Sequence, residues 1–588
     1  MPVYPAAGAC DVGDVCEIEK SVTAEDLDTR EAEVAGSSQQ VDVVIVGAGP
    51  VGLALATELA MRGHTACIVE KNERIGLQPR AKTTNVRTMT HMRRWGLAPT
   101  MRERSPLAPD FPRRVRFATA LFGKELYSFD NAFCASPARD PRYPEHAEFI
   151  PQYVVEGILF DHVMAEPRVE VLLQHELTDF TATEADGVAA AVKDLRDGST
   201  RTITGRFLVG ADGGRSTVRR GLGIAMAGER SLLSCVTLIL RMPGLKDDPT
   251  LHHALFHWLV SPEAPCVMGP MDRDDRWYWM KTIPPGTEPS DGELLELIRK
   301  AMRKDYPIEI LARDYWTVHK LIADAYRRGN VFLAGDACHL HSPFGGHGMN
   351  LGVADAVDLG WKISAVLDGW AGEALLDSYE TERKPVHRQV IETATENVAA
   401  LSEYFLAPAL EDETAEGQAQ RGRTAEAIAA IKEPEFRSLG IVLGYRYRSP
   451  HILAEEAGDP PPFSITTYRP ESYPGCLAPH AWLAGGGSLY DHFGDGFTFL
   501  VSGKEVDDEE GSFLKAAAEA GMPLTCLALD ALDEETLGKL YPRRYTLIRP
   551  DQHVAWRGDV LPAFEALFDT VVRGRKAAAE NKMGTIRA

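Results

Sequence analysis

The sequence has 588 residues, of which 44% are hydrophobic and 25% are charged, and its formal net charge is -22. This composition is typical of a globular protein, and the length suggests about three structural units. The acidic balance excludes an overall basic footprint for nucleic acid or an anionic membrane. The nine cysteines contain no CxxC pair. Their wide spacing disfavours a disulfide framework or a metal site and favours reduced thiols in the cytoplasm.

The first forty residues are acidic and lack the apolar region of a signal peptide. We expect residues 1–40 to form a disordered tail. The most apolar stretch, residues 43–57, contains three glycines and is too short to span a bilayer. No membrane partner is therefore expected.

A βαβ unit begins at Val41. The run Val41-Asp-Val-Val-Ile-Val46 is rich in β-branched residues and predicts a buried parallel strand. Residues 53–62 have helical spacing, and residues 65–70 form a second strand-like run. Strand, helix and strand within about 30 residues are typical of a nucleotide-binding unit.

The turn between the first strand and the helix is Gly47-Ala-Gly-Pro-Val-Gly52. In such a turn, Gly47 permits the sharp bend, Gly49 lets a pyrophosphate approach the backbone, and Gly52 lets helix and strand pack closely. The helix N-terminus then faces the phosphates. Glu70 ends the second strand, where a carboxylate can accept the ribose hydroxyls of an adenosine.

Two later strands also end at carboxylates. They are Phe207-Leu-Val-Gly-Ala-Asp212 and Val331-Phe-Leu-Ala-Gly-Asp336. Ser216 can cap a helix after the first of them. The second is followed by Pro343-Phe-Gly-Gly-His-Gly-Met-Asn350 and then a helix. Three glycines before a helix predict a backbone nest for a polar or anionic group.

Together and in this order, the three motifs resemble those of the para-hydroxybenzoate hydroxylase family, the class A flavoprotein aromatic monooxygenases. The resemblance implies that the first motif holds the ADP half of FAD, the second serves FAD and the nicotinamide cofactor, and the third holds the ribityl chain. The glycine segment would lie against the isoalloxazine ring. Arg80 would contact the ribityl and phosphate region, and Gln152 the ribityl chain. The implied cofactor-binding residues are Gly47, Gly49, Pro50, Val51, Gly52, Glu70, Lys71, Arg80, Gln152, Asp212, Asp336, Pro343, Gly346, Gly348, Met349 and Asn350.

The resemblance extends to the phenol-hydroxylase-like subgroup, through residues 440–448, 479–483 and 548–557. It implies an α/β fold: a Rossmann-like FAD-binding domain, an inserted antiparallel-sheet substrate domain and a C-terminal thioredoxin-like domain. The expected boundaries are a tail at 1–40, the FAD-binding domain at 41–405 with substrate segments mainly at 225–320, a helical segment and linker at 406–475, and the thioredoxin-like domain at 476–588.

The middle region is dense in aromatic residues and predicts an antiparallel sheet that covers a pocket. A phenol is activated when its proton is drawn off, so the pocket should hold a base or an acceptor. His253, His257 and Tyr278 are candidates, but each is more typical of an ordinary sheet residue. We therefore assign no catalytic residue. His339 is expected to support its loop rather than act as a base.

The implied function is an FAD-dependent monooxygenase that hydroxylates a phenol-like substrate with NAD(P)H and O2, through a flavin C4a-hydroperoxide. Two alternatives stay open. One is a Baeyer–Villiger or antibiotic-modifying monooxygenase of the same fold, and the other is a non-catalytic flavin-binding interaction protein. No metal is expected, and a homodimer is implied by the family alone.

Overall fold

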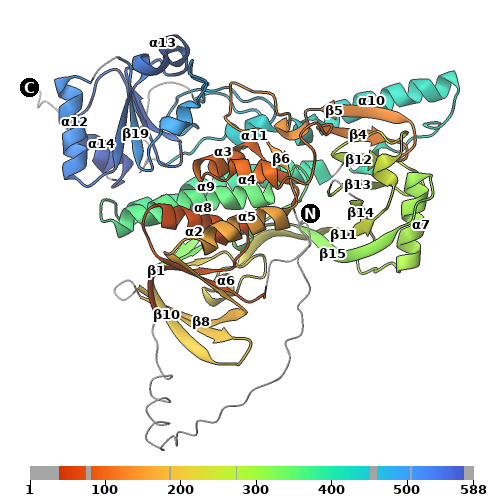
Figure 1. The fold of residues 1–588 in the computed structure, drawn as a ribbon, viewed down its shortest axis with the longest axis horizontal. Coiled ribbons are helices and arrows are strands. Elements are labelled where there is room, and N and C mark those ends of the chain that lie inside the picture. Colours follow the sequence, from red (N-terminus) through yellow and green to blue (C-terminus); the bar gives the residue numbers. More distant parts are fainter. Residues whose placement is uncertain are drawn as a thin grey trace, which may run out of the picture.

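The computed structural model describes residues 39–73, 81–183, 187–272, 275–398, 400–449, 460–503 and 506–574. Arg80 and the predicted tail up to residue 38 lie outside these ranges. Figure 1 shows three regions: a sheet with β1 and β10 at the bottom, a sheet with β11 to β15 at the right, and the C-terminal domain, in blue, at the upper left. Helices α2, α5, α8 and α9 occupy the centre.

The first sheet, here called the flavin sheet, has the strand order β16-β17-β10-β1-β2-β7, with β9 and β8 added on β10. β1 pairs in parallel with both β10 and β2, and its last four residues are buried, as expected for a parallel sheet covered on both faces. The strands are β1 (Gln39–Val46), β2 (Ala66–Glu70), β7 (Val169–Leu173), β8 (His175–Thr183), β9 (Gly187–Asp194), β10 (Thr200–Gly210), β16 (Arg327–Arg328) and β17 (Val331–Leu333).

The predicted boundary between tail and strand is wrong by two residues. Gln39 and Gln40 pair with Ile203 and Thr204 of β10, so they belong to β1 and not to the tail. Nothing in the local sequence shows this, because the extension depends on a partner strand far along the chain.

Close helix packing covers the flavin sheet. α8 (Gly348–Leu367) lies against α2 (Pro50–Met61), which begins at Pro50, earlier than the predicted helix. Two glycines of α8 permit this approach: a Cβ on Gly352 would lie 2.5 Å from Val51 Cγ2, and one on Gly360 would lie 2.7 Å from Glu58 Cβ. The other helices of this part are α3 (Val86–Arg94), α4 (Ala98–Glu103), α5 (Gln152–Met164), α6 (Thr217–Gly221) and α9 (Glu373–Val398).

The second sheet, here called the substrate sheet, has the order β18-β15-β11-β14-β13-β12-β4-β5. Three of its strands, β4, β5 and β18, lie outside residues 225–320, where the substrate segments were mainly expected. Its pairs are antiparallel except for β12 with β4. The strands are β4 (Arg114–Ala118), β5 (Glu125–Asp130), β11 (Met226–Arg241), β12 (Phe256–Leu259), β13 (Cys266–Pro270), β14 (Arg276–Ile283), β15 (Glu309–Ala323) and β18 (His339–Leu340).

The two faces of the substrate sheet have different neighbours. Trp277 and Trp279 pack in one cluster with α7 (Asp291–Met302). Trp258 contacts Phe436 of α10 (Ala415–Phe436) and Phe344, and Tyr278 belongs to the same cluster as these rings. Since side chains alternate along a strand, one face forms a closed core and the other faces the flavin domain. A short ribbon of β3 (Thr83–Thr84) and β6 (Glu148–Phe149), and helix α11 (Leu439–Leu443), complete this region.

The C-terminal domain has a four-stranded sheet in the order β20-β19-β21-β22. β19 is parallel to β20 and antiparallel to β21, which is the thioredoxin-like arrangement. Its core is continuous with the flavin domain, because Phe497 contacts both Trp361 and Trp370. The elements are β19 (Phe497–Val501), α12 (Asp508–Glu519), β20 (Leu524–Ala528), α13 (Leu529–Leu540), β21 (Tyr545–Ile548), β22 (Val554–Gly558) and α14 (Phe564–Val571).

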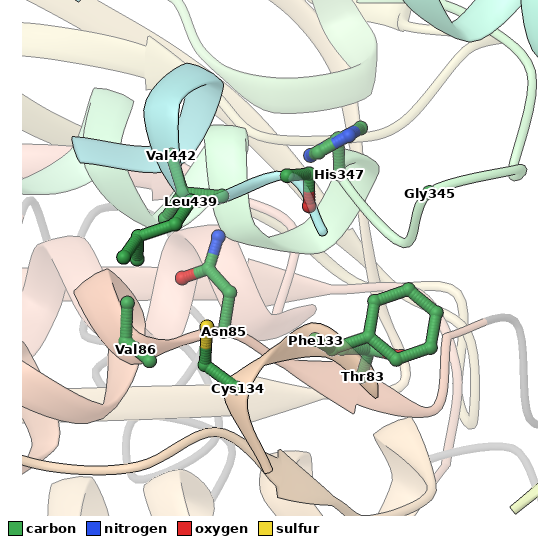
Figure 2. A pocket seen from close by; sticks show the side chains of 10 residues that line it. Thr83, Asn85, Val86, Phe133, Cys134, Gly345, His347, Leu439 and Val442 are labelled. Carbon is green, nitrogen blue, oxygen red and sulfur yellow. The ribbon is translucent and has the colours of Figure 1, made fainter. Parts of the chain in front are cut away.

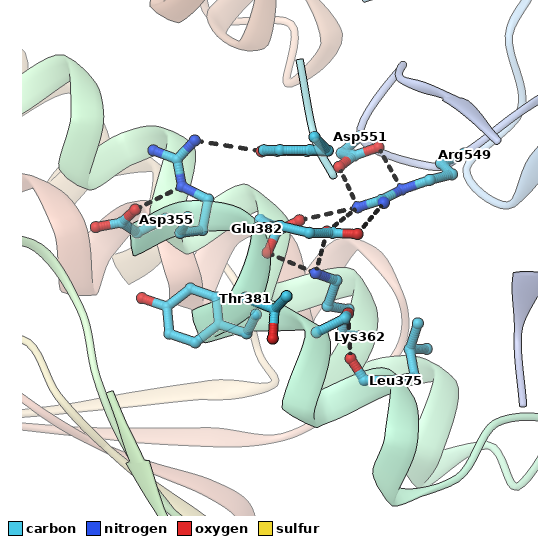
Figure 3. A network of polar contacts seen from close by, with 12 residues as sticks. Asp355, Lys362, Leu375, Thr381, Glu382, Arg549 and Asp551 are labelled. Atoms are coloured by element: carbon cyan, nitrogen blue, oxygen red, sulfur yellow. Dashed lines mark hydrogen bonds and ion pairs between the residues drawn. The ribbon is translucent and has the colours of Figure 1, made fainter. Parts of the chain in front are cut away.

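A buried ion cluster joins this domain to α8 and α9 (Figure 3). Arg549 Nη1 lies 2.8 Å from Glu382 Oε1, and its Nη2 lies 3.1 Å from Asp358 Oδ1 and 2.8 Å from Asp551 Oδ2. Lys362 Nζ lies 2.8 Å from Asp358 and 2.7 Å from Glu382. All five side chains are buried. Loss of one partner would leave buried charge uncompensated.

We expect Arg549→Met to lower the free energy of unfolding by about 3–5 kcal/mol, because Glu382 and Asp551 would lose their shared cation in a site closed to water. The measurement is unfolding in denaturant, with FAD bound. The control is Lys515→Met in the same domain. Lys515 pairs with Glu519, and both side chains are exposed, so its loss should cost less than about 1 kcal/mol. Equal losses from the two variants would contradict the role given to the cluster.

We also expect no thiol–disulfide exchange from the C-terminal domain. Burial raises the pKa of Cys476 to about 12 and that of Cys526 to about 11. The thiolate is the reactive form, so both thiols should be inert at neutral pH. The double variant Cys476→Ser/Cys526→Ser should keep wild-type turnover of NAD(P)H. A large loss of turnover, or reduction of a disulfide peptide by the wild type, would show the idea to be wrong.

Candidate flavin and substrate site

The glycine turn before α2 combines two tight contacts with one open position. A Cβ on Gly47, whose φ is +108°, would lie 2.4 Å from the carbonyl oxygen of Ala211. A Cβ on Gly52 would lie 2.0 Å from the carbonyl oxygen of Gly47. At Gly49, by contrast, no atom lies within 4 Å of the Cβ position. The open space adjoins the free N–H groups of α2, which suits a pyrophosphate.

Glu70 supports the same turn from the end of β2. Its Oε2 accepts a hydrogen bond from Ala48 N at 2.8 Å, and its Oε1 accepts one from Asn72 N at 2.9 Å. An ionised carboxylate has room for further donors, so these bonds leave it able to accept ribose hydroxyls. Lys71, the next residue, is exposed.

The second motif places Asp212 beside Gly47. One of its carboxylate oxygens has no partner among the described residues. Asp212 Oδ2 accepts hydrogen bonds from Thr217 N and Val218 N and so caps α6. Its Oδ1 is buried and has no partner within the described ranges. Because buried polar atoms are nearly always hydrogen-bonded, this oxygen fits a donor on a bound cofactor. Ser216 also caps α6, as the sequence predicts, by accepting from Arg219 N at 2.9 Å.

Arg219 joins the second motif to the third, a contact that the sequence analysis does not predict. Its Nη1 donates to the carbonyl of Ala337 at 2.8 Å, and its Nη2 donates to that of Gly214 at 2.9 Å. In the sequence, Arg219 is one of two adjacent arginines in a short helix, which is typical of a solvated helix end. Only the fold brings residues 214 and 337 within reach of one side chain.

The third motif lies against the first. Gly335, with a φ of +60°, approaches Val51 so closely that a Cβ would lie 2.8 Å from Val51 Cγ2. Asp336 follows it in a single 3-10 turn (Gly335–Ala337) and is exposed. The first and third motifs, which are almost 300 residues apart in the sequence, therefore form one surface.

Asn350 fixes the glycine loop that precedes α8. Its Nδ2 donates to the carbonyls of Gly346, at 2.6 Å, and Thr83, at 2.8 Å. Its Oδ1 accepts from Asn85 N at 2.9 Å. In the same loop Pro343 is exposed, while Gly348 and Met349 form the first turn of α8. Asn350 thus ties the glycine loop to the ribbon of β3.

Gln152 begins α5 and lies near the same ribbon. Its backbone N–H donates to the carbonyl of Ala81 at 2.8 Å, and its Nε2 donates to Glu156 Oε1 at 2.6 Å. Gln152 therefore contacts Ala81, the residue that follows Arg80. The structure brings the three motifs, the glycine loop and Gln152 together, and their individual contacts with FAD stay predictions.

Asp355, on α8, supports the third motif from below. It accepts hydrogen bonds from Gly335 N at 3.1 Å, His339 Nε2 at 3.0 Å, Arg383 Nε at 2.7 Å and His387 Nε2 at 2.8 Å. Burial opposes its charge, but His387, Arg383 and the hydrogen bonds hold its pKa well below the usual range. This geometry favours the supporting role expected for His339, whose ring is fully buried.

A small cavity lies between the glycine loop and α11 (Figure 2). Thr83 and Phe133 line one side, His347 and Leu439 line the other, and Asn85 lies between them. Burial lowers the pKa of His347 to about 4, so its ring is neutral at physiological pH. The other lining residues are Val86, Cys134, Gly345, Ser438 and Val442.

The structure separates the three candidates for phenol activation. Tyr278 lies on the face of the substrate sheet that packs with Phe344 of the glycine loop. His257 instead stacks on Trp277, which belongs to the core under α7. His253 precedes β12 and contacts Phe111 edge-on. Of the three, only Tyr278 belongs to the apolar cluster that includes the glycine loop.

The glycine turn and the two strand ends that meet at it fit a dinucleotide cofactor, and the glycine loop places that cofactor beside an aromatic sheet. Residues 40–394 match the family described as FAD binding domain, and residues 471–573 match aromatic-ring hydroxylase, C-terminal. The chain belongs to the class A FAD-dependent aromatic-ring hydroxylases, and FAD is its cofactor.

Similar proteins cover almost the whole chain. Aklavinone 12-hydroxylase DnrF of Streptomyces peucetius is 34% identical over 485 residues, which are 80% of this chain and 93% of that protein. The solved structure of RebC with bound 7-carboxy-K252c is 34% identical, with a TM-score of 0.82 over 92% of this chain and 100% of that one. Aklavinone-11 hydroxylase with FAD and aklavinone is 29% identical, with a TM-score of 0.77 over 91% of this chain and 99% of that one.

Among the helices of the described ranges, none combines the length and the apolar character that a membrane crossing requires.

Gly49→Val should lower FAD retention at least tenfold, because the new side chain would fill the space beside the N-terminus of α2. The chain itself should fold, since φ is -73° and nothing lies within 4 Å of the Cβ position. FAD content after gel filtration and the Kd of the apoprotein for FAD are the measurements. Gly157→Ala is the matched control, because its Cβ position is equally open but lies within α5. Full FAD content in Gly49→Val would place the pyrophosphate elsewhere.

Proposed function

We propose that this FAD-dependent monooxygenase hydroxylates a polycyclic aromatic substrate that carries a phenolic hydroxyl, with NAD(P)H as the electron donor and O2 as the oxygen source. The observation that carries the proposal is the aromatic face of the substrate sheet beside the glycine loop. Trp258 on that face lies 5.9 Å from Phe344 of the loop, measured between ring centroids.

The aromatic face continues as a series of ring contacts. Phe256 lies 5.5 Å from Tyr278, 4.8 Å from Phe149 and 6.2 Å from Phe133, each in an edge-on arrangement. Phe133 also lines the cavity of Figure 2. Rings arranged in this way offer large, rigid contact area to a planar aromatic molecule. Two similar proteins, the hydroxylase of S. peucetius and aklavinone-11 hydroxylase, are named for aklavinone, which supports a fused-ring substrate.

When bound, FAD supplies the chemistry that activates oxygen. The chain has to hold the substrate against the glycine loop and keep water away from it. Phe256, Tyr278 and Phe149 serve the first task by their ring faces and edges. The burial of Tyr278, Phe149 and Phe344 serves the second, and Phe256 is half-buried beside them.

The experiment is a substrate panel that compares single-ring phenols with hydroxylated anthraquinones and related fused-ring compounds. NAD(P)H consumption and ¹⁸O incorporation from ¹⁸O2 are measured for each compound. We expect fused-ring phenols to stimulate NAD(P)H oxidation and to gain one labelled oxygen. Labelled product from single-ring phenols alone would contradict the proposed substrate class.

Proton NMR of the product separates ring hydroxylation from the Baeyer–Villiger alternative. Hydroxylation removes one aromatic proton, whereas oxygen insertion beside a ketone creates an ester. An ester product would overturn hydroxylation while leaving the monooxygenase class intact.

A further inference from the structure

Lys82 is a half-buried lysine whose amine lies against aromatic rings. Its Nζ lies over the ring of Tyr278 and 5.1 Å from the ring centroid of Phe256. No carboxylate forms an ion pair with it anywhere in the part of the chain that the structure describes. Burial lowers the pKa of Lys82 well below that of a free lysine, because an unpaired ammonium is poorly solvated there.

The backbone of Lys82 is fixed between the glycine loop and the ribbon of β3 and β6. Its carbonyl accepts a hydrogen bond from Ile150 N at 2.8 Å. The carbonyl of the next residue, Thr83, accepts a hydrogen bond from Asn350. Thr83 also lies so close to Gly346 that a Cβ placed on Gly346 would be 2.9 Å from Thr83 Cβ. The side chain thus starts at the glycine loop and ends against the aromatic face of the substrate sheet.

Two titratable groups lie on the elements packed against Lys82. Tyr278, on β14, has a buried hydroxyl with no partner among the residues described, and burial raises its pKa well above the usual value. Glu148, on β6, is occupied elsewhere: its carboxylate oxygens lie 3.4 Å from Ser105 Oγ and 3.7 Å from His146 Nδ1. The site therefore holds an amine whose charged form is disfavoured and a neutral phenol, both without hydrogen-bonding partners among the described residues.

We propose that Lys82 is the catalytic base that accepts the proton of the substrate's phenolic hydroxyl. The O–H bond of the substrate breaks, its electron pair stays on oxygen, and an N–H bond forms on Nζ, so nothing is oxidised or reduced. The product is an ammonium–phenolate pair. The hydroxyl of Tyr278 is the free donor beside it. This role rests on the proposed function, since it requires a phenolic substrate.

Physical chemistry favours the pair over either ion alone. An isolated ammonium or phenolate in an apolar site is costly, whereas the two charges together compensate one another. Loss of the proton also raises the electron density on the ring carbons ortho and para to the phenolic oxygen. These are the carbons that an electrophilic oxygen attacks. A base matched in this way contributes roughly 10²–10⁴-fold to a rate.

The test uses 1,2-dihydroxyanthraquinone as a probe, because its visible absorption moves to longer wavelength when a phenolic hydroxyl ionises. The oxidised holoenzyme, without NAD(P)H, is mixed with the probe in a buffer below the pKa of the free dye. We expect wild type to bind the dye in its ionised form. Lys82→Met and Lys82→Gln should bind it in its neutral form, with their FAD content unchanged.

Lys281→Met is the matched control. Lys281 lies three residues from Tyr278 on the same strand, but its Nζ donates to the carbonyl of Pro265 at 3.0 Å. This variant should ionise the dye as wild type does. Lys82→Ala should regain the ionised spectrum when a small alkylamine is added, a result that a merely structural role would not produce.

Turnover gives a second and independent measurement. With any substrate from the panel that is hydroxylated, Lys82→Met should lower kcat by roughly 100-fold, the lower end of the range for a general base. Neutral dye on wild type, or ionised dye on Lys82→Met, would overturn the role of Lys82. Because dye ionisation needs no turnover, a substrate panel without any product would overturn the proposed function and leave this test in force.

Discussion

Asp355 accepts four hydrogen bonds in a site closed to water, and the donors come from two parts of the chain. The Gly335 backbone and His339 belong to the third motif, while Arg383 and His387 belong to α9. An ionised carboxylate at this depth is stable only because these groups surround it. The position of the third motif therefore depends on α9, which in turn contacts the C-terminal domain.

The C-terminal domain reaches this site through two adjacent routes. Arg383 donates to the hydroxyl of Tyr447 at 3.2 Å, and Arg549 lies over the ring of the same tyrosine. The second contact is made by Arg87 of α3, which donates to the side chain of Gln552 and to the carbonyl of Asp551 in the C-terminal domain. The C-terminal domain thus contacts both α9 and α3, the helix that follows β3. It stabilises the walls of the flavin site without lining the glycine turn.

The sequence was sufficient for the parts of the site that are local. Gly47, Gly49 and Gly52 lie in one short turn, and their roles follow from backbone geometry that six residues determine. Asp212 and Asp336 were found because each ends an apolar run. Asp355, Arg219 and Arg549 could not be found in this way, since their partners lie far away in the chain and a charged residue in a helix usually faces solvent. Lys82 follows Arg80 by two residues, but only the approach of β14 shows that its amine lies against an aromatic ring.

The order of strands in the flavin sheet has a consequence for the nascent protein. β10 pairs with β1 on one side and with β17 on the other, and the chain between β10 and β17 forms most of the substrate sheet. At a synthesis rate of about 5–20 residues per second, β10 waits on the order of ten seconds for β17 to leave the ribosome. During that time its edge offers the apolar residues Phe207, Leu208 and Val209 to any strand nearby. The inserted sheet therefore leaves this edge of the flavin sheet open to mispairing while the chain is being made.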